Sequence, residues 1–398
     1  MGKQLDLLLQ APLSPTGKVH LRVVDVLGFA GITLLGVFAR FALMNYVSGD
    51  YTSFLEEWFN ELQAAGGIRG IGLSIGDYTP PYLYLMALLT YLPLNSLYSI
   101  KLLSCVFDLL LAGSMLRCFA ARQYSPAALL GIYAAVLFMP TILLNSAYWA
   151  QCDVIFTFFV VQSLFCGLEK RPLASSVYFG IAFSLKLQSI FFLPLLALLF
   201  LKDRLKIRHL LMIPGVYLLS ILPAWIAGRP LSELLTIYFR QSGQYSRLCM
   251  NAPNLWYLIG DDRTSGLSLL AIFLTLAGVL FSLYLLYCFP FPLTRGNLLL
   301  AALYFSLLLP YLMPHMHERY FFLADVLALL YACWRPRRFY LPLLVGFSSL
   351  AGYFPFLFGQ SPIDLRLAVL GITVALGICI RDLYKPLFRP KERRNRLM

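Results

Sequence analysis

The chain has 398 residues, of which 60% are hydrophobic, 15% aromatic and 13% charged. Its mean hydropathy of +0.74 excludes an ordinary soluble domain, since such domains are about half apolar and one quarter charged. The net charge of +13 does not indicate nucleic-acid binding, because Lys and Arg lie in short clusters between apolar runs. That is the positive-inside pattern of membrane proteins, in which the basic clusters face the cytoplasm and anionic lipid.

Apolar runs long enough to cross a hydrocarbon layer of about 30 Å recur along the chain. We therefore predict an all-α polytopic membrane protein, a single integral domain over 1–398 with a cytoplasmic N-terminus at 1–22 and a basic cytoplasmic tail at 385–398. No signal-peptide layout precedes the first run, so its helix is predicted to be an uncleaved signal. About twelve crossings are expected. They lie near 24–44, 99–119, 127–144, 154–168, two within 173–201, 210–227, 267–289, 297–313, 320–334, 341–358 and 365–380.

Charge parity divides the loops between the crossings into two sets. If every basic cluster is cytoplasmic, the alternate loops are external. These external loops are 49–77, 145–153, 229–266, 314–319 and 359–364. The apolar segment 80–94 is too short to span, and counting it as a crossing would place Arg117 and Arg122 outside. We predict that it is an interfacial or re-entrant piece of the first external loop, 45–97.

The segment 173–201 has basic residues at both ends, "EKRP" before it and "KDRLKIRH" after it. It holds too few residues for two full crossings of about 20 residues each. We predict two shortened helices that turn near Lys186, because such breaks are tolerated where they line a cavity.

Four polar constellations fall on the predicted external side: "SGDYTSFLEEWF", "IGDYTPPYLY", "NSAYWAQCD" and "HMHERYFF". Ionisable groups at membrane depth are costly and mark substrate pathways or reaction sites. Lys186 and Arg319 facing one apolar cavity would bind an anion, and the phosphate of a lipid suits both side chains. A carboxylate opposite them would act as a general base toward an acceptor hydroxyl.

Each constellation also has a structural interpretation. Asp50 fits an N-cap, Gln151 and Asp153 fit caps of the next crossing, and Glu318 fits the first turn of a helix. Asp77 fits a turn before two prolines, and Lys186 fits a side chain that snorkels to the interface.

The residues after Asp50 predict an amphipathic surface helix with Glu56, Glu57 and Glu61 in water. Its apolar face is predicted to carry Phe54, Leu55, Trp58, Phe59 and Leu62. His315 is predicted to be structural or interfacial.

The motifs together resemble a known family. "GDY" followed by Trp58, then "DYTPPYLY", "LKLQ" and "HER", occur in this order over most of the chain. They are similar to the GT-C glycosyltransferases of the dolichyl-phosphate-glucose-dependent type, and more so to bacterial mannosyltransferases related to the GPI second-mannose enzyme. "YWAQCD" and "NAPNLWYL" are also similar to that bacterial group. The resemblance implies a GT-C-like fold whose first external loop carries amphipathic helices over the active site.

The resemblance also implies roles for single residues. The family's catalytic acid corresponds to Asp50, and its His-Glu-Lys motif to His317, Glu318 and Arg319, with Arg in place of Lys. Its Lys-Gln pair corresponds to Lys186 and Gln188, with one leucine inserted. A second acid that many relatives carry just after the first is replaced here by "YTS", which leaves Asp50 alone or paired in space with Asp77 or Asp153. Supporting roles are expected for Asp77, Tyr78, Trp149, Gln151, Asp153, Asn251, Asn254 and Trp256.

The predicted activity is inverting transfer of a hexose, mannose or glucose, from an undecaprenyl or dolichyl phosphate to a hydroxyl of a lipid-linked glycan or glycolipid. Arg319 and Lys186 would hold the phosphate, and His317 would bond the phosphate or hold Asp50 in place. Tyr78, Trp149 and Trp256 would be sugar platforms or aromatics of the interface belt. No metal and no cofactor are expected. A bacterial inner membrane is favoured, with the endoplasmic reticulum open, and the site on the non-cytoplasmic face.

Two rival activities remain open at the level of sequence. A transporter or flippase would use the same ionisable residues as relays, although no internal repeat supports it. A ligase or polymerase that uses lipid diphosphates would be expected to have a larger basic external loop.

Overall fold

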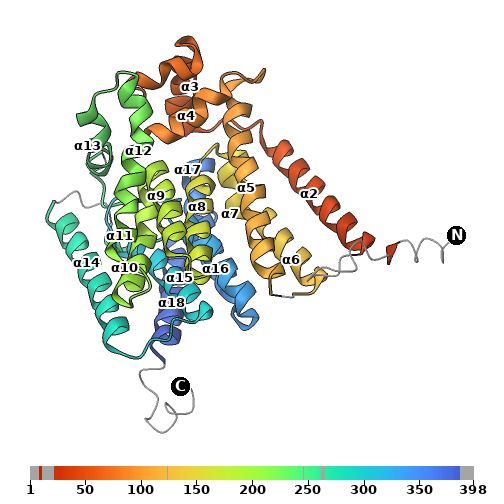
Figure 1. Ribbon diagram of the computed structural model, residues 1–398, viewed down its shortest axis with the longest axis vertical. Coiled ribbons are helices and arrows are strands. Elements are labelled where there is room, and N and C mark those ends of the chain that lie inside the picture. Colours follow the sequence, from red (N-terminus) through yellow and green to blue (C-terminus); the bar gives the residue numbers. More distant parts are fainter. Residues whose placement is uncertain (1–8, 11–21, 123, 245, 261–264, 386–398) are drawn as a thin grey trace, which may run out of the picture. The chain divides into compact units, whose positions relative to one another are not determined.

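The structure is a computed structural model that describes residues 9–10, 22–122, 124–244, 246–260 and 265–385 (Figure 1). The segments 1–22 and 385–398, predicted to be cytoplasmic, fall almost entirely outside the described residues. The chain forms two compact units. Unit 1 comprises Met1–Gly70 and Met86–Phe158, and unit 2 comprises Ile71–Leu85 and Phe159–Met398. The single domain expected from the sequence stays a prediction.

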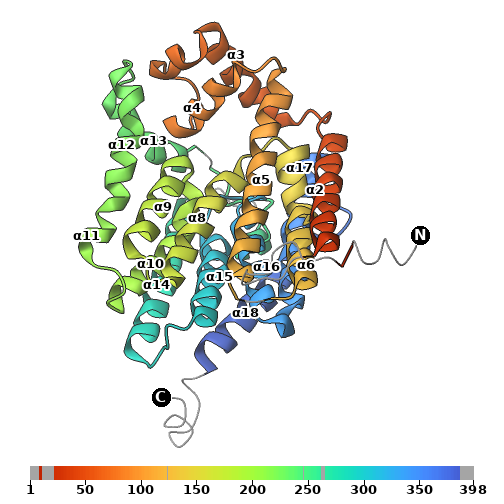
Figure 2. The ribbon, with the colours of Figure 1, turned by 45° about the vertical axis from the view of Figure 1, so that its right-hand side comes forward.

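Unit 1 is built around α5 (Ser96–Ala120), which packs against α6, α3 and η3 and runs beside α6 in both ribbon views (Figures 1 and 2). Asn95 caps α5 by accepting a hydrogen bond from the Tyr98 amide, and Ser125 caps α6 in the same way. The other elements of the unit are α2 (Val23–Leu43), the π-helix η1 (Tyr51–Leu55), α3 (Glu56–Ala64), α6 (Pro126–Leu137), α7 (Pro140–Leu143) and the π-helix η3 (Leu144–Tyr148). Three elements have residues in both units: η2 (Gly67–Gly72), α4 (Pro80–Leu89) and α8 (Asp153–Leu168).

Unit 2 has α15 (Arg295–Leu312) at its centre, buried along most of its length and packed against α14, α16 and α18. The remaining helices are α9 (Pro172–Leu185), η4 (Leu187–Phe192), α10 (Leu193–Leu201), α11 (Ile207–Leu210), α12 (Met212–Ile226), α13 (Leu231–Ser242), η5 (Leu255–Leu258), α14 (Ser265–Cys288), α16 (Phe322–Trp334), η6 (Pro336–Arg338), α17 (Tyr340–Phe358) and α18 (Leu365–Tyr384). The only strands in the described part of the chain are β1 (Cys249–Met250) and β2 (Met316–His317), which pair in parallel.

Seven helices of the described residues are long and apolar enough to cross a membrane. They are Val23–Leu43, Ser96–Ala120, Ile207–Ile226, Gly266–Cys288, Arg295–Leu312, Pro336–Phe358 and Leu365–Tyr384. These helices confirm the predicted all-α, multi-pass membrane protein. Five shorter apolar helices complete the set: Pro80–Leu89, Asp153–Leu168, Pro172–Leu185, Leu187–Leu201 and Phe322–Trp334. The count of twelve crossings and their sidedness stay predictions.

The crossing predicted as continuous over 127–144 is bent instead. Pro126–Leu137 and Pro140–Tyr148 form a pair inclined at 45°. Met139, which precedes Pro140, has the extended backbone angles φ −62° and ψ 121°. A proline disfavours the helical conformation of the residue before it, so the break follows from Pro140.

The helices α9 and α10 confirm the predicted turn near Lys186. Lys186 has the extended angles φ −157° and ψ 135° between the end of α9 and the start of η4. At the opposite end, a Cβ placed on Gly167 would lie 3.5 Å from Ser175 Oγ of α9 and 3.6 Å from Leu199 Cδ1 of α10. The first turns of α9 and the last turn of α10 are therefore neighbours, as in a hairpin.

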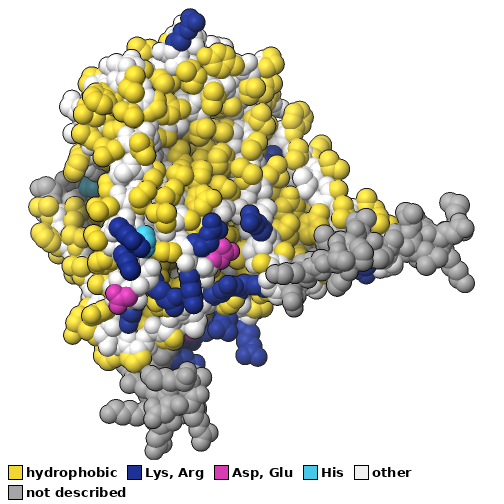
Figure 3. All heavy atoms as spheres, in the orientation of Figure 1, with side chains coloured by type: hydrophobic (Ala, Val, Ile, Leu, Met, Phe, Trp, Pro, Cys, Tyr) yellow, Lys and Arg dark blue, Asp and Glu magenta, His cyan; other side chains and the backbone are white. Residues whose placement is uncertain are grey.

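The basic loop that follows α10 is exposed at this end of unit 2. Lys206, Arg204 and Arg208 are exposed, and Lys202 is half-buried. Figure 3 shows Lys and Arg side chains gathered where α10 and α11 lie in Figure 1, with hydrophobic side chains covering the face beyond them. This separation of basic and apolar surface is the one expected of a helix end at a lipid headgroup layer.

The predicted amphipathic helix corresponds to η1 and α3. Glu57 and Glu61 are exposed, and the buried face consists of Leu55, Trp58, Phe59 and Leu62. An α-helical spacing predicts Phe54 on that face as well. This prediction is wrong, since Phe54 is 40% exposed. The reason is that residues 51–55 form a π-helix, whose wider turn rotates Phe54 away from the buried side.

Candidate functional site

The first group of predicted site residues meets within unit 1. Asp50 Oδ2 accepts a hydrogen bond of 3.0 Å from Trp149 Nε1 and one of 2.5 Å from Gln151 Nε2. We call these three residues the carboxylate site. Two predicted external loops, about a hundred residues apart in the chain, are thus joined side chain to side chain.

The capping role considered for Asp50 is wrong. Asp50 precedes η1, but its side chain makes no hydrogen bond to the first turn of that helix. Its backbone is helical, with φ −64° and ψ −34°, whereas a capping residue normally has extended angles. The carboxylate is instead directed to the indole and amide donors of Trp149 and Gln151.

The backbone is irregular in both segments that form the carboxylate site. The π-helix η1 begins directly after Asp50, and the π-helix η3 ends directly before Trp149. Between Trp149 and Gln151, Ala150 has φ +69°, a left-handed angle that side-chain-bearing residues rarely adopt. π-turns and strained angles of this kind are found often at functional sites, and each strained residue costs about 1–3 kcal/mol.

Serine hydroxyls hold the backbone on either side of the strained Ala150. Ser48 Oγ donates 2.7 Å to the Trp149 carbonyl, and Ser104 Oγ donates 2.7 Å to the Gln151 carbonyl. Both serines are buried. The two donors to Asp50 are therefore fixed through their own main chain.

Sequence reasoning missed three buried charges in unit 1. Arg40 Nε lies 2.8 Å from Asp108 Oδ2, and Ser146 Oγ of η3 donates 2.8 Å to Asp108 Oδ1. Lys101 Nζ donates to the carbonyls of residues 44 and 46, at 2.9 and 2.6 Å. The spacing of Lys101, Ser104 and Asp108 in an apolar run was the signal that would have found them.

Asp153 lies in the first turn of α8, where an acid is favoured by the helix dipole. Its Oδ2 accepts 2.8 Å from Asn145 Nδ2. The buried Asp153 therefore links α8 to η3.

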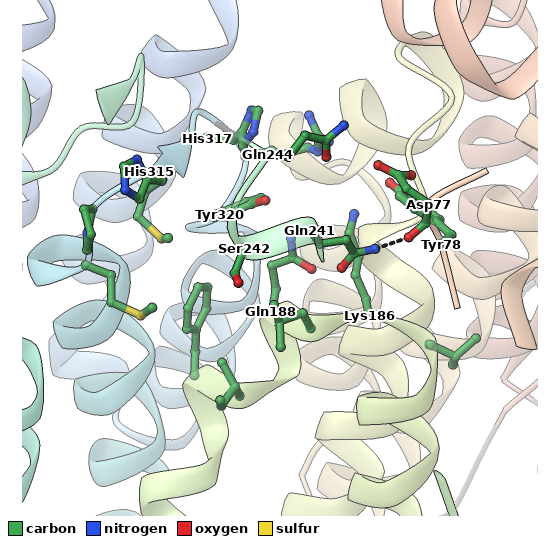
Figure 4. A pocket seen from close by; sticks show the side chains of 18 of the residues that line it. Asp77, Tyr78, Lys186, Gln188, Gln241, Ser242, Gln244, His315, His317 and Tyr320 are labelled. Atoms are coloured by element: carbon green, nitrogen blue, oxygen red, sulfur yellow. Dashed lines mark hydrogen bonds between the residues drawn. The ribbon is translucent and has the colours of Figure 1, made fainter. Parts of the chain in front are cut away.

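The second group of predicted site residues lines a cavity of about 240 Å³ within unit 2 (Figure 4). Six predicted site residues line it: Asp77, Tyr78, Lys186, Gln188, His317 and Arg319. Sequence reasoning did not foresee four further polar lining residues: Gln241, Ser242, Gln244 and Tyr320. We call this cavity the cationic pocket.

Two basic side chains give the cationic pocket its character. Lys186 is only 6% exposed, and its Nζ lies 5.6 Å from the ring centroid of Tyr78. It does not snorkel to a surface. Arg319 Nη1 lies 3.2 Å from Glu318 Oε1, and Glu318 is itself buried. Glu318 therefore orients the guanidinium. Its predicted place in the first turn of a helix is wrong, because α16 begins only at Phe322 and Asp325 is the acid of its first turn.

Burial shifts two titratable groups of the pocket in opposite directions. Burial raises the pKa of Asp77 even though Gln244, Lys186 and Arg319 favour its charged form. Burial, followed by the charges of Arg319 and Lys186, lowers the pKa of His317 to about 3. His317 is thus a neutral hydrogen-bonding group at physiological pH, and the pocket favours an anion.

The segment that carries His317 and Arg319 is joined to the loop before η5. β1 pairs with β2, and Asn251 forms a further bridge to His317. The His315 amide donates 2.8 Å to the Leu248 carbonyl, and His315 Nδ1 lies 2.6 Å from the Arg247 carbonyl. His315, with φ +60°, therefore has a structural role in addition to lining the pocket.

Gly352 of α17 lets this pair of segments approach the helix. A Cβ on Gly352 would lie 2.9 Å from the Asn251 carbonyl oxygen and 3.3 Å from that of Glu318. Any larger residue would push the motif segment away from α17.

Asn254 and Trp256 fasten η5 to the end of α15. Asn254 Nδ2 donates to the carbonyls of Pro310 and Met313, at 3.3 and 3.4 Å. Trp256 Nε1 donates 2.6 Å to the Leu312 carbonyl, and its ring packs with Leu248 and Ala271. The structure does not place these two residues, or Asn251, on the pocket wall. The ring of Trp149 is fully buried, which argues against an open sugar platform there.

The loop with Asp77 and Tyr78 is bound to α13 and α9. Gln241 Nε2 donates to the Asp77 carbonyl, as the dashed line in Figure 4 shows. Thr79 Oγ1 donates 3.1 Å to the Leu185 carbonyl, and Ser74 Oγ donates 2.5 Å to Glu233. Asp77 is therefore a pocket residue as well as a residue before the turn at Pro80.

The described residues contain no group of three or more His, Cys, Asp or Glu side chains arranged to hold a metal ion. The carboxylate site offers a carboxylate held by two donors, and the cationic pocket offers two cations, the carboxyl group of Asp77 and several side-chain amides. Comparison with models of known protein families and with curated proteins gave no match to this chain.

Proposed function

We propose that the protein is an inverting hexosyltransferase of the GT-C type. It would transfer mannose or glucose from a polyprenyl phosphate to a hydroxyl of a lipid-linked glycan or glycolipid on the non-cytoplasmic face. The observation that carries the proposal is the presence of the buried Lys186 and of Arg319 on one cavity with an apolar wall. The proposal includes a fold with about twelve membrane crossings.

The polar side of the pocket suits a phosphate. Lys186 offers a compact charge and Arg319 a planar fork, and both recognise phosphate oxygens. Gln188 and the amides at the end of α13 add uncharged donors. Negative charge grows on the phosphate as its bond to the sugar breaks. Cations fixed in a buried site stabilise that charge without reorganisation, which is a large source of catalysis.

The apolar side of the pocket favours a lipid phosphate over a free one. Leu187, Ile190, Phe191 and Ile272 line it together with two methionines. In Figure 4 the methionine sulfur atoms lie on the side of His315, away from Asp77 and Tyr78. Ile272 belongs to α14, on which the neighbouring Phe273 is 66% exposed. α14 is among the helices able to span, so this wall adjoins a surface suited to hydrocarbon.

Asp50 would act as the general base. It would take the proton of the acceptor hydroxyl as the acceptor oxygen bonds to the anomeric carbon and polyprenyl phosphate leaves with the electrons of the broken C–O bond. The two hydrogen bonds to Oδ2 hold the carboxylate in one orientation. General-base help of this kind contributes roughly 10²- to 10⁴-fold.

The test is release of polyprenyl phosphate by purified protein in vesicles supplied with synthetic polyprenyl-phosphate mannose and glucose. We expect one of the two donors to be consumed and a glycosylated lipid to form with inverted configuration. Absence of release with every donor, together with movement of a lipid-phosphate sugar between leaflets, would contradict the proposal in favour of a flippase.

A second arm of the same experiment addresses the lipid. Donors with a short, water-soluble isoprenoid chain should bind less tightly than long-chain donors, because they contact less of the apolar wall. Ile272→Asp should weaken the binding of the long-chain donor more than the binding of the short-chain donor. Leu280→Asp, on the same exposed face of α14 but outside the pocket lining, is the control.

A further inference from the structure

α5 carries three buried polar side chains on one face of an otherwise apolar helix. Lys101 and Asp108 are 0% exposed and Ser104 is 1% exposed. Their spacing of three and four residues aligns them along the helix. Charged groups inside a helix able to span a membrane cost free energy, so their presence indicates a functional role.

The three side chains contact the two segments that form the carboxylate site. Lys101 binds the carbonyls of Met44 and Tyr46, at the end of α2 and just before Asp50. A cation at a helix C-terminus is favoured by the helix dipole. Ser104 binds the carbonyl of Gln151.

Asp108 binds the remaining part of the second segment. It accepts the hydroxyl of Ser146 in η3 and pairs with Arg40 of α2. The same carboxylate therefore links α2 to the π-helix that ends before Trp149.

We infer that Lys101, Ser104 and Asp108 are positioning residues for Asp50. They hold the segments 44–50 and 146–151 in the register that brings the indole of Trp149 and the amide of Gln151 to one carboxylate oxygen. The inference rests on the proposed function only in that Asp50 is taken to act on substrate. These three residues are called the α5 polar stripe.

Fold stabilisation alone would leave two observations unexplained. Replacing a buried ion pair by apolar residues of similar volume is often neutral or stabilising, so a pair such as Arg40 and Asp108 is not required for a stable fold. Strained angles such as that of Ala150 persist only where the surroundings fix them. The stripe contacts the chain one residue after Ala150, through Ser104, and four residues before it, through Asp108 and Ser146.

The experiment compares Ser104→Ala and the double variant Arg40→Met, Asp108→Leu with the wild type. Ser99→Ala is the matched control, because Ser99 is a buried serine of α5 whose hydroxyl has no hydrogen-bond partner among the described residues. Two readouts are recorded on folded protein: sugar-transfer kinetics, and fluorine NMR of the protein labelled with 5-fluorotryptophan. Trp149→Phe assigns the Trp149 resonance.

A positioning role predicts that kcat falls roughly 10- to 100-fold in both variants while the donor KM stays close to that of the wild type. The Trp149 resonance should move in both and stay in place in Ser99→Ala. An unchanged Trp149 resonance and unchanged kcat in the folded variants would overturn the inference. If the double variant does not fold, Ser104→Ala and Asp108→Asn decide by the same two readouts.

The design separates the inference from the proposed function. If the wild type transfers no sugar from any donor, the proposed function fails. The fluorine spectra still report whether the α5 polar stripe holds Trp149 in place, since they need no activity.

Discussion

The carboxylate site of unit 1 and the cationic pocket of unit 2 are built by opposite means. In unit 1, irregular helix and short side-chain hydrogen bonds hold Asp50 in direct contact with its neighbours. In unit 2, helix ends and a short strand pair arrange Lys186 and Arg319 around an open volume. A fixed carboxylate suits a group that takes one proton, and cations around a cavity suit a group that holds an incoming anion.

The largest effect expected in the pocket comes from Arg319→Gln. Loss of the guanidinium removes a preorganised charge from the developing phosphate, which costs about 10²- to 10³-fold in kcat. Donor affinity should also fall, and Arg319→Lys should recover part of it, because Lys keeps the charge but not the fork. Single-turnover release of polyprenyl phosphate measures the first effect, and equilibrium binding of the donor the second.

Arg366→Gln provides the comparison for that substitution. Arg366 is an exposed arginine of unit 2 and does not line the pocket. Equal losses in the two variants would show that net charge matters and that the pocket does not.

The next effect concerns the frame of the pocket. Gly352→Ala would place a methyl group 2.9 Å from the Asn251 carbonyl and should destabilise the protein by about 1–3 kcal/mol through overpacking. Gly377→Ala in α18 meets no atom within 4 Å and should be neutral or stabilising by up to about 1 kcal/mol. Thermal unfolding in detergent measures both, and a Gly352→Ala protein as stable as wild type would refute the close approach.

The smallest effect is a pH dependence of stability. The folded pKa of His317 is about 3, below its ordinary value of 6.5. Below pH 6.5 the unfolded chain therefore binds more protons than the folded one, and stability declines as the pH falls from 6.5 toward 3. The loss is about 2 kcal/mol at pH 5. His317→Gln should flatten this part of the profile, and an unaltered slope would show that His317 is not the group.

The sequence was sufficient for features set by hydrophobic pattern and charge. Apolar length predicted the spanning helices, and basic residues on both flanks predicted the break at Lys186. The resemblance to a known family predicted site roles for six residues that line the cationic pocket. Apolar length alone predicted a single crossing over 127–144. Pro140 was the signal for the bend, because a proline disfavours the helical conformation of the residue before it.

Features that depend on contacts across the fold could not be predicted. Nothing local pairs Asp50 with Trp149, or β1 with β2, since each pairing depends on how distant segments pack. The π-turn that exposes Phe54 breaks the 3.6-residue period on which the helix face was predicted. The contribution of α13 to the pocket was also missed, because Gln241 and Gln244 resemble ordinary surface residues in sequence.

The division of labour between the two regions is tested most directly by Asp50→Asn. The account predicts that the variant binds the polyprenyl-phosphate donor as tightly as the wild type, while single-turnover release of polyprenyl phosphate falls roughly 10²- to 10⁴-fold. Asparagine keeps the size of the side chain and removes its basicity. Release at the wild-type rate, or a loss of donor binding as large as the loss of release, would contradict the account.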